Sequence, residues 1–211
     1  MNFGKVLLLS PHFDDEALGC GGLLMKLPAK HVHVRYFNTV HPSVHHDTYM
    51  KEAQSVAQMA GFVASVSPLT GVNKLDRYPI AEFVDDIEKI INVIQPRTLL
   101  VPHVSYNQDR RVIFEAAITA SRMHDTNWYV KNILIYEQPE TLHTNRIEPR
   151  FVPHVFVPIN IEDKLDLFRL YKSQQRGHRT EDHLRYLAGL RGMQCNQPYA
   201  EAFMVIRITN D

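Results

Sequence analysis

The chain has 211 residues, of which 45% are hydrophobic, and its 23 Lys and Arg residues balance its 23 Asp and Glu residues. This length and apolar content suit a single folded domain over residues 1–211, and the absence of a basic run argues against a nucleic acid partner. No apolar run is long enough to span a membrane, and two cysteines are too few for a disulfide framework, so we expect a cytoplasmic protein.

The first polar cluster of the chain directly follows an apolar run. Residues 5–10 contain one valine and three consecutive leucines, which predicts a buried strand. His12, Asp14, Asp15 and Glu16 come next, and Glu16 also begins a predicted helix. The cluster therefore lies at the carboxyl end of a strand, where open α/β sheets bind ligands.

These residue types suit a site for metal binding and proton transfer. His12 and one aspartate can hold a borderline divalent ion such as zinc, while the other aspartate is free to deprotonate bound water. A simpler interpretation is that Asp14 or Asp15 only caps the helix that follows. The residues alone leave both interpretations open.

The rest of the chain alternates predicted strands and helices. The strands cover residues 31–37, 63–66, 98–101, 133–137, 155–158 and 199–206, and the further helices cover residues 47–60, 80–94 and 112–123 and a segment from residue 162. This alternation predicts an α/β fold with a Rossmann-like open, mostly parallel sheet flanked by helices. The loop over residues 38–46 carries three histidines at the same edge of the sheet, so we take His41 as a candidate substrate contact.

A second polar cluster follows the strand over residues 98–101. It contains His103, Asn107, Asp109 and Arg110 and repeats the plan of the first cluster, a buried strand that ends in Pro-His before a polar turn. If the strand order is 3-2-1-4-5, the two strands are neighbours, and both clusters face one crevice.

The two clusters resemble the motifs of a known family. Pro-His-Phe-Asp-Asp-Glu over residues 11–16 resembles the (A/P)HPDDE signature of the LmbE-like, or PIG-L, N-deacetylases, with Phe13 where proline is usual. Asn-Gln-Asp-Arg over residues 107–110 lies where that family has H-x-D-H or N-Q-D-H. Weaker matches extend the resemblance over nearly the whole chain: Glu52, residues 136–137, residues 172–174 and residues 200–203.

The resemblance implies a zinc-dependent hydrolase that removes an acetyl group from an N-acetylated amino sugar or related conjugate. His12 and Asp15 would bind Zn²⁺ or another divalent cation, Asp14 would be the general base, and Asp109 would belong to a catalytic polar network. We assign Asn107 to the substrate-binding side of the site, with His41 and Arg110. A homo-oligomer is compatible with the sequence.

Arg110 departs from the family pattern, because it stands where the third metal ligand, a histidine, is expected. A guanidinium is cationic and has no lone pair for a metal. Three alternatives follow. His103 or a histidine of the 38–46 loop supplies the missing ligand; or a metal binds weakly, completed by water or substrate; or Arg110 pairs with Asp14 or Asp15 in a metal-free, sugar-binding or scaffold protein.

Overall fold

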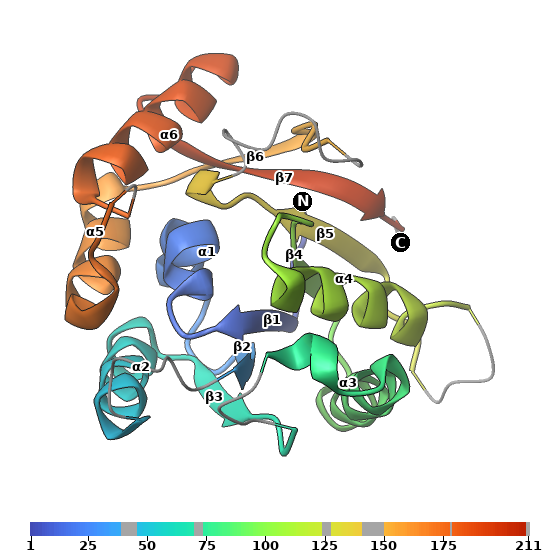
Figure 1. The fold of residues 1–211 in the computed structure, drawn as a ribbon. Coiled ribbons are helices and arrows are strands. Elements are labelled where there is room, and N and C mark those ends of the chain that lie inside the picture. Colours follow the sequence, from blue (N-terminus) through green and yellow to red (C-terminus); the bar gives the residue numbers. More distant parts are fainter. Residues whose placement is uncertain (39–45, 70–73, 124–127, 141–149, 178, 210–211) are drawn as a thin grey trace.

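The computed structural model describes the chain except for residues 39–45, 70–73, 124–127, 141–149, 178 and 210–211 (Figure 1). A seven-stranded sheet has the order β3-β2-β1-β4-β5-β7-β6. Its strands are β1 (Val6–His12), β2 (Val32–Asn38), β3 (Val63–Val66), β4 (Thr98–Pro102), β5 (Asn132–Tyr136), β6 (Val155–Pro158) and β7 (Ala200–Arg207). The α-helices are α1 (Asp15–Lys26), α2 (His46–Ala60), α3 (Ile80–Ile94), α4 (Gln108–Ala120), α5 (Ile161–Leu170) and α6 (Glu181–Gln194), with 3-10 turns η1 (Leu75–Arg77) and η3 (Lys172–Gln174). None of the helices in this described part combines the length and apolar content that crossing a membrane requires.

Strand β1 lies between two hydrophobic cores, one on each face of the sheet. Val6 and Leu8 pack with residues of α1 and α2, whereas Leu7 and Leu9 pack with residues of α3 and α4. Figure 1 shows the corresponding helix layers on the two sides of the sheet. A strand covered on both faces needs apolar residues at every position, which explains the uninterrupted run in the sequence.

The first five strands have the order 3-2-1-4-5, the condition under which the two polar clusters were expected to share one crevice. Strand β1 pairs in parallel with β2 on one side and with β4 on the other, so the strand order reverses at β1. The predicted mostly parallel sheet is confirmed, since the antiparallel pairs among the described strands are β5–β7 and β7–β6. The carboxyl ends of β1 and β4 therefore lie side by side and bring the two polar clusters together.

Two helices begin where the sequence did not predict them. Helix α4 begins at Gln108 rather than at residue 112, because the Asn107 side chain accepts hydrogen bonds from the backbone N–H of Asp109 (2.9 Å) and Arg110 (3.4 Å). Helix α6 covers part of the stretch over residues 176–185 that showed no helical pattern. No helical period is visible there because Leu184 is the one large apolar residue between residues 176 and 185.

The close packing of α1 on the sheet yields a stability test. A Cβ atom added at Gly19 would lie 2.4 Å from Cδ2 of Tyr136, whose hydroxyl donates to the backbone carbonyl of Leu9 (2.9 Å) and so holds the ring in place. We expect Gly19→Ala to lower the free energy of unfolding by about 1–3 kcal/mol, measured by urea denaturation. Gly189→Ala is the matched control, because its Cβ would lie 3.9 Å from Tyr199, an ordinary contact. It should raise stability by about 0.5–1 kcal/mol. Equal effects of the two substitutions would contradict the packing described.

Candidate active site

The turn between β1 and α1 places its acidic residues in unlike environments. Asp14 has the left-handed backbone angles φ 97° and ψ −23°, which few non-glycine residues adopt. Its side chain makes no capping hydrogen bond to α1, so the simpler interpretation of Asp14 as a helix cap is wrong. Asp15 instead turns back and accepts a hydrogen bond from the backbone N–H of His12 (3.2 Å). Strain of this kind at a strand end is typical of functional sites.

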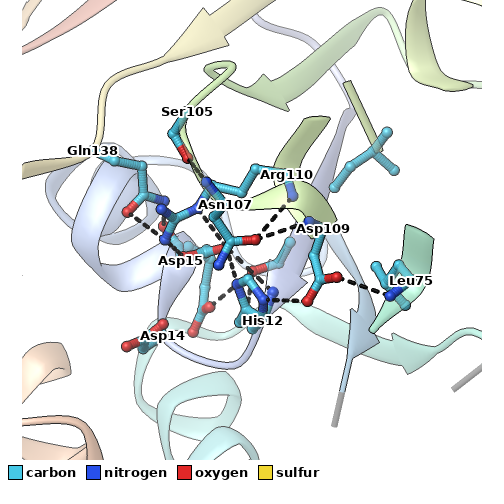
Figure 2. A network of polar contacts seen from close by, with 12 residues as sticks. His12, Asp14, Asp15, Leu75, Ser105, Asn107, Asp109, Arg110 and Gln138 are labelled. Carbon is cyan, nitrogen blue, oxygen red and sulfur yellow. Dashed lines mark hydrogen bonds and ion pairs between the residues drawn. The ribbon is translucent and has the colours of Figure 1, made fainter. Parts of the chain in front are cut away.

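His12 lies between two carboxylates that are far apart in the sequence. Its Nδ1 is 3.2 Å from Oδ2 of Asp15, and its Nε2 is 2.9 Å from Oδ2 of Asp109 (Figure 2). An ionised carboxylate only accepts hydrogen bonds, so both ring nitrogens must act as donors. Burial disfavours the charged ring, but the hydrogen bonds to Asp109 and Asp15 outweigh burial and raise the pKa of His12 to about 9. Both carboxylates therefore favour the protonated ring.

Asp109 is held from its other side by the segment before α3. Its Oδ1 accepts a hydrogen bond from the backbone N–H of Leu75 (2.8 Å), which belongs to η1. Leu75 is itself fully buried in the core beneath α3 and α4. The Asp109 carboxylate is thus fixed at both oxygens, and it fixes the His12 ring in turn.

Arg110 forms a two-pronged ion pair with Asp15, and both side chains are fully buried. Its Nη2 is 2.5 Å from Oδ1 of Asp15, and its Nε is 3.3 Å from Oδ2. Burial alone would raise the pKa of Asp15, but the charges of Arg110 and His12 hold it well below its usual range. Nη2 of Arg110 also donates to Oε1 of Gln138 (3.4 Å), whose side-chain amide donates to the backbone carbonyl of Asp15 (3.1 Å). Glu140 pairs with Nη1 of Arg110.

Asp14 pairs with a second arginine, Arg179. Arg179 precedes α6 and keeps 13% of its side chain exposed, while Asp14 is fully buried. The pair uses Oδ2 of Asp14, and within the described residues Oδ1 has no hydrogen-bond partner. Burial raises the pKa of Asp14 to about 6 against the opposing charge of Arg179. A buried carboxylate with one free oxygen and a pKa near neutrality can accept a proton from water.

Glu16 connects the β1–α1 turn to neighbouring segments through two hydrogen bonds. It accepts hydrogen bonds from Oγ of Ser10 (3.2 Å) and from the hydroxyl of Tyr171 (2.5 Å), and it thereby connects β1 to the end of α5. Burial raises the pKa of Glu16 to about 7. Two other residues that carry the family resemblance also connect distant segments. Glu52 accepts hydrogen bonds from Ser173, and Glu201 accepts hydrogen bonds from the backbone of α1.

The structure brings together five of the eight site residues predicted from the sequence: His12, Asp14, Asp15, Asp109 and Arg110. Asn107 lies beside them as the cap of α4. His103 is buried, and its ring packs edge-on against Phe151, with 5.4 Å between ring centroids. His41 lies outside the described residues. The substrate contact of His41 and the metal-ligand role of His103 stay predictions.

Three contributors to the site were missed in the sequence. Gln138 and Glu140 follow β5 at the same sheet edge as His12, and this position was a usable signal. Arg179 is 165 residues from Asp14 and has no motif around it, so no local pattern pointed to it.

Zinc is the ion that the resemblance implies, and the donor set does not fit it. Asp15 gives both oxygens to Arg110, and both nitrogens of His12 face carboxylates. Across the described residues, no group of three or more His, Cys, Asp or Glu side chains is placed to hold a metal ion. His41 and the side chains of the next two histidines lie outside that part of the chain. No reaction step through a metal follows from this arrangement.

Comparison with solved structures gives the class of fold. The 4-carboxy-2-hydroxymuconate hydratase GalB of Pseudomonas putida is 16% identical and superposes with a TM-score of 0.76, over 98% of this chain and 99% of that one. The N,N'-diacetylchitobiose deacetylase of Pyrococcus horikoshii is 22% identical with a TM-score of 0.76, over 96% and 84% of the two chains. A zinc-inhibited form of teicoplanin deacetylase is 16% identical with a TM-score of 0.74, over 98% and 99%.

These neighbours are of the LmbE and PIG-L type, as the resemblance in the sequence predicted. At such identities the likeness establishes the fold. The neighbours include deacetylases named for diacetylchitobiose and for teicoplanin, and one hydratase. No protein-family model matches the chain, and no curated protein sequence does.

The raised pKa of Glu16 predicts how stability changes with pH. A carboxyl whose pKa rises on folding destabilises the folded state as the pH increases through the interval between its unfolded and folded values, here about 4.5 to 7. We therefore expect Glu16→Gln to gain stability relative to the unmodified chain between pH 5 and pH 8, by about 2–3 kcal/mol, in urea denaturation at each pH.

Glu181→Gln is the control for this pH series. The hydrogen bond with Arg169 lowers the pKa of the Glu181 carboxyl, so its titration lies below the unfolded value of 4.5. Glu181→Gln should therefore cost a small amount of stability that does not change between pH 5 and pH 8. A constant difference between the Glu16→Gln variant and the unmodified chain from pH 5 to pH 8 would show that Glu16 titrates normally.

Proposed function

We propose that the chain is a hydrolase of the deacetylase type, which removes an acetyl group from an amino sugar or related small conjugate. The observation that carries this proposal is Asp14, a fully buried carboxylate in a left-handed turn with one oxygen unpaired among the described residues. The deacetylases with this fold support the choice of reaction, because their substrates include diacetylchitobiose and teicoplanin.

The reaction follows from the groups beside Asp14. Oδ1 of Asp14 is buried as well as unpaired among the described residues, so the proposed reaction requires Arg179 to shift and admit water. Oδ1 then accepts a proton from that water while the water oxygen bonds to the amide carbon and the carbonyl electrons move onto oxygen. Arg179 pairs with Oδ2 and reaches the surface, so it supplies positive charge next to the developing oxyanion. Collapse of the tetrahedral intermediate breaks the C–N bond, and Asp14 returns the proton to the leaving nitrogen. Acetate and a free amine result.

The remaining site residues have supporting roles in this proposal. Asp109 orients His12, and Asn107 fixes the first turn of α4 that carries Asp109 and Arg110. The metal-dependent version of the reaction, with His12 and Asp15 as ligands, would require Asp15 to release Arg110.

A second candidate function is sugar binding without turnover. Both acids of the turn are paired with arginines, Asp15 with Arg110 and Asp14 with Arg179, which is what a site that has lost its chemistry would show. The two functions differ in a single property, the release of acetate from a bound ligand.

The test is acetate release from N-acetylglucosamine, diacetylchitobiose and N-acetylglucosaminides, with ligand binding measured by calorimetry on the same preparations. We expect turnover, and Asp14→Asn should reduce it by about 100-fold or more, because it removes the base at nearly constant shape. Asp85→Asn, an exposed change on α3, should leave turnover intact. Turnover that survives in Asp14→Asn would refute the role of Asp14. Binding without any acetate release would establish the second candidate.

A further inference from the structure

The guanidinium of Arg110 joins three separate segments of the chain. Arg110 comes from the first turn of α4, Asp15 from the start of α1, and Gln138 and Glu140 from the segment after β5. Arg110 is the largest of the fully buried side chains among the described residues. A cation that joins several loops at a strand edge in this way has the structural task of a bound metal ion.

The charges around Arg110 agree with this task. Asp15, Asp109 and Glu140 lie within hydrogen-bond or ion-pair distance of Arg110 or His12. Arg110 supplies a positive charge among these carboxylates, and each ring nitrogen of His12 faces one of them. A guanidinium has no lone pair to offer a metal ion.

A metal ion and Arg110 cannot both use Asp15 in this arrangement. The guanidinium takes one oxygen at 2.5 Å and the other at 3.3 Å. A dication at the same carboxylate would meet a fixed positive charge in a site from which water is largely excluded, where repulsion is poorly screened.

We infer that the Arg110 guanidinium permanently replaces the divalent ion in this site, so that the protein needs no metal for its fold. The inference does not rest on the proposed function, since it holds for a hydrolase and for a binding protein alike. It also explains why Arg110 stands where the resemblance leads one to expect a ligand.

The test begins with the unmodified chain, purified without an affinity metal or a chelator. Elemental analysis should find well under one zinc per chain. Neither zinc chloride nor EDTA should shift the melting temperature by more than about 1 °C, because nothing that binds the folded state is added or removed. About one zinc per chain, or a melting temperature lowered by EDTA, would overturn the inference.

Arg110→His is the informative variant, because it removes the guanidinium and restores an imidazole at the expected ligand position. We expect it to bind about one zinc per chain, at least about 100-fold more tightly than the unmodified chain by calorimetry. Zinc at a hundredfold excess over the Kd should raise its melting temperature by about 5 °C or more. Equal zinc affinity in the two proteins would contradict the inference.

Two controls separate this site from the other histidines of the chain. Arg110→Met removes the cation without offering a ligand, so it should lose stability and gain no zinc. Adding His12→Asn to Arg110→His should abolish the gained zinc binding, and zinc retained in the double variant would mean that it binds elsewhere and would refute the inference. If Arg110→His does not fold, the zinc content and EDTA response of the unmodified chain still decide the question.

Discussion

The buried ion pair between Arg110 and Asp15 is the interaction on which the rest of the site depends. Taking both charges out of water is costly, and only close geometry with further hydrogen bonds offsets that cost. The structure provides both, through the two-pronged contact and through Gln138, which bonds the side chain of Arg110 and the backbone of Asp15. With Asp15 held in this way, His12 is confined between Asp15 and Asp109.

The two arginines of the site differ in burial and in the acid that each one contacts. Arg110 is fully buried and fixed by groups from three segments, so it acts as part of the scaffold. Arg179 keeps part of its side chain exposed and contacts Asp14, whose Oδ1 has no hydrogen-bond partner among the described residues. Ion pairs with arginine therefore hold both acids of the turn, and in the proposed function the unpaired Oδ1 of Asp14 takes part in proton transfer.

Much of this arrangement could be predicted from the sequence, because its causes are local. The apolar run of β1 reflects burial on both faces, and the α3 pattern gives its bounds, residues 80–94. The strand order at β1 then places the two polar clusters together. The start of α4 was missed because Asn107 and the residues after it look like a polar turn, although asparagine is a strong N-cap residue.

The remaining features depend on contacts between distant parts of the chain. Nothing near Arg179 in the sequence indicates that it meets Asp14. The contact of the His103 ring with Phe151 is likewise one that the sequence did not indicate, and the expected role of His103 at the site stays a prediction. The sequence left the partner of Arg110 open between Asp14 and Asp15, and the structure shows Asp15, with Gln138 and Glu140 as further partners. Side-chain direction at a strand end is set by such tertiary packing.

The most direct test of the central claim is a crystal structure of the unmodified chain grown with excess zinc, with anomalous diffraction recorded at the zinc edge. The account predicts no anomalous peak between His12 and Asp15, and density for the Arg110 guanidinium lying against both oxygens of Asp15. A strong peak at that position, with Arg110 turned away from Asp15, would contradict it.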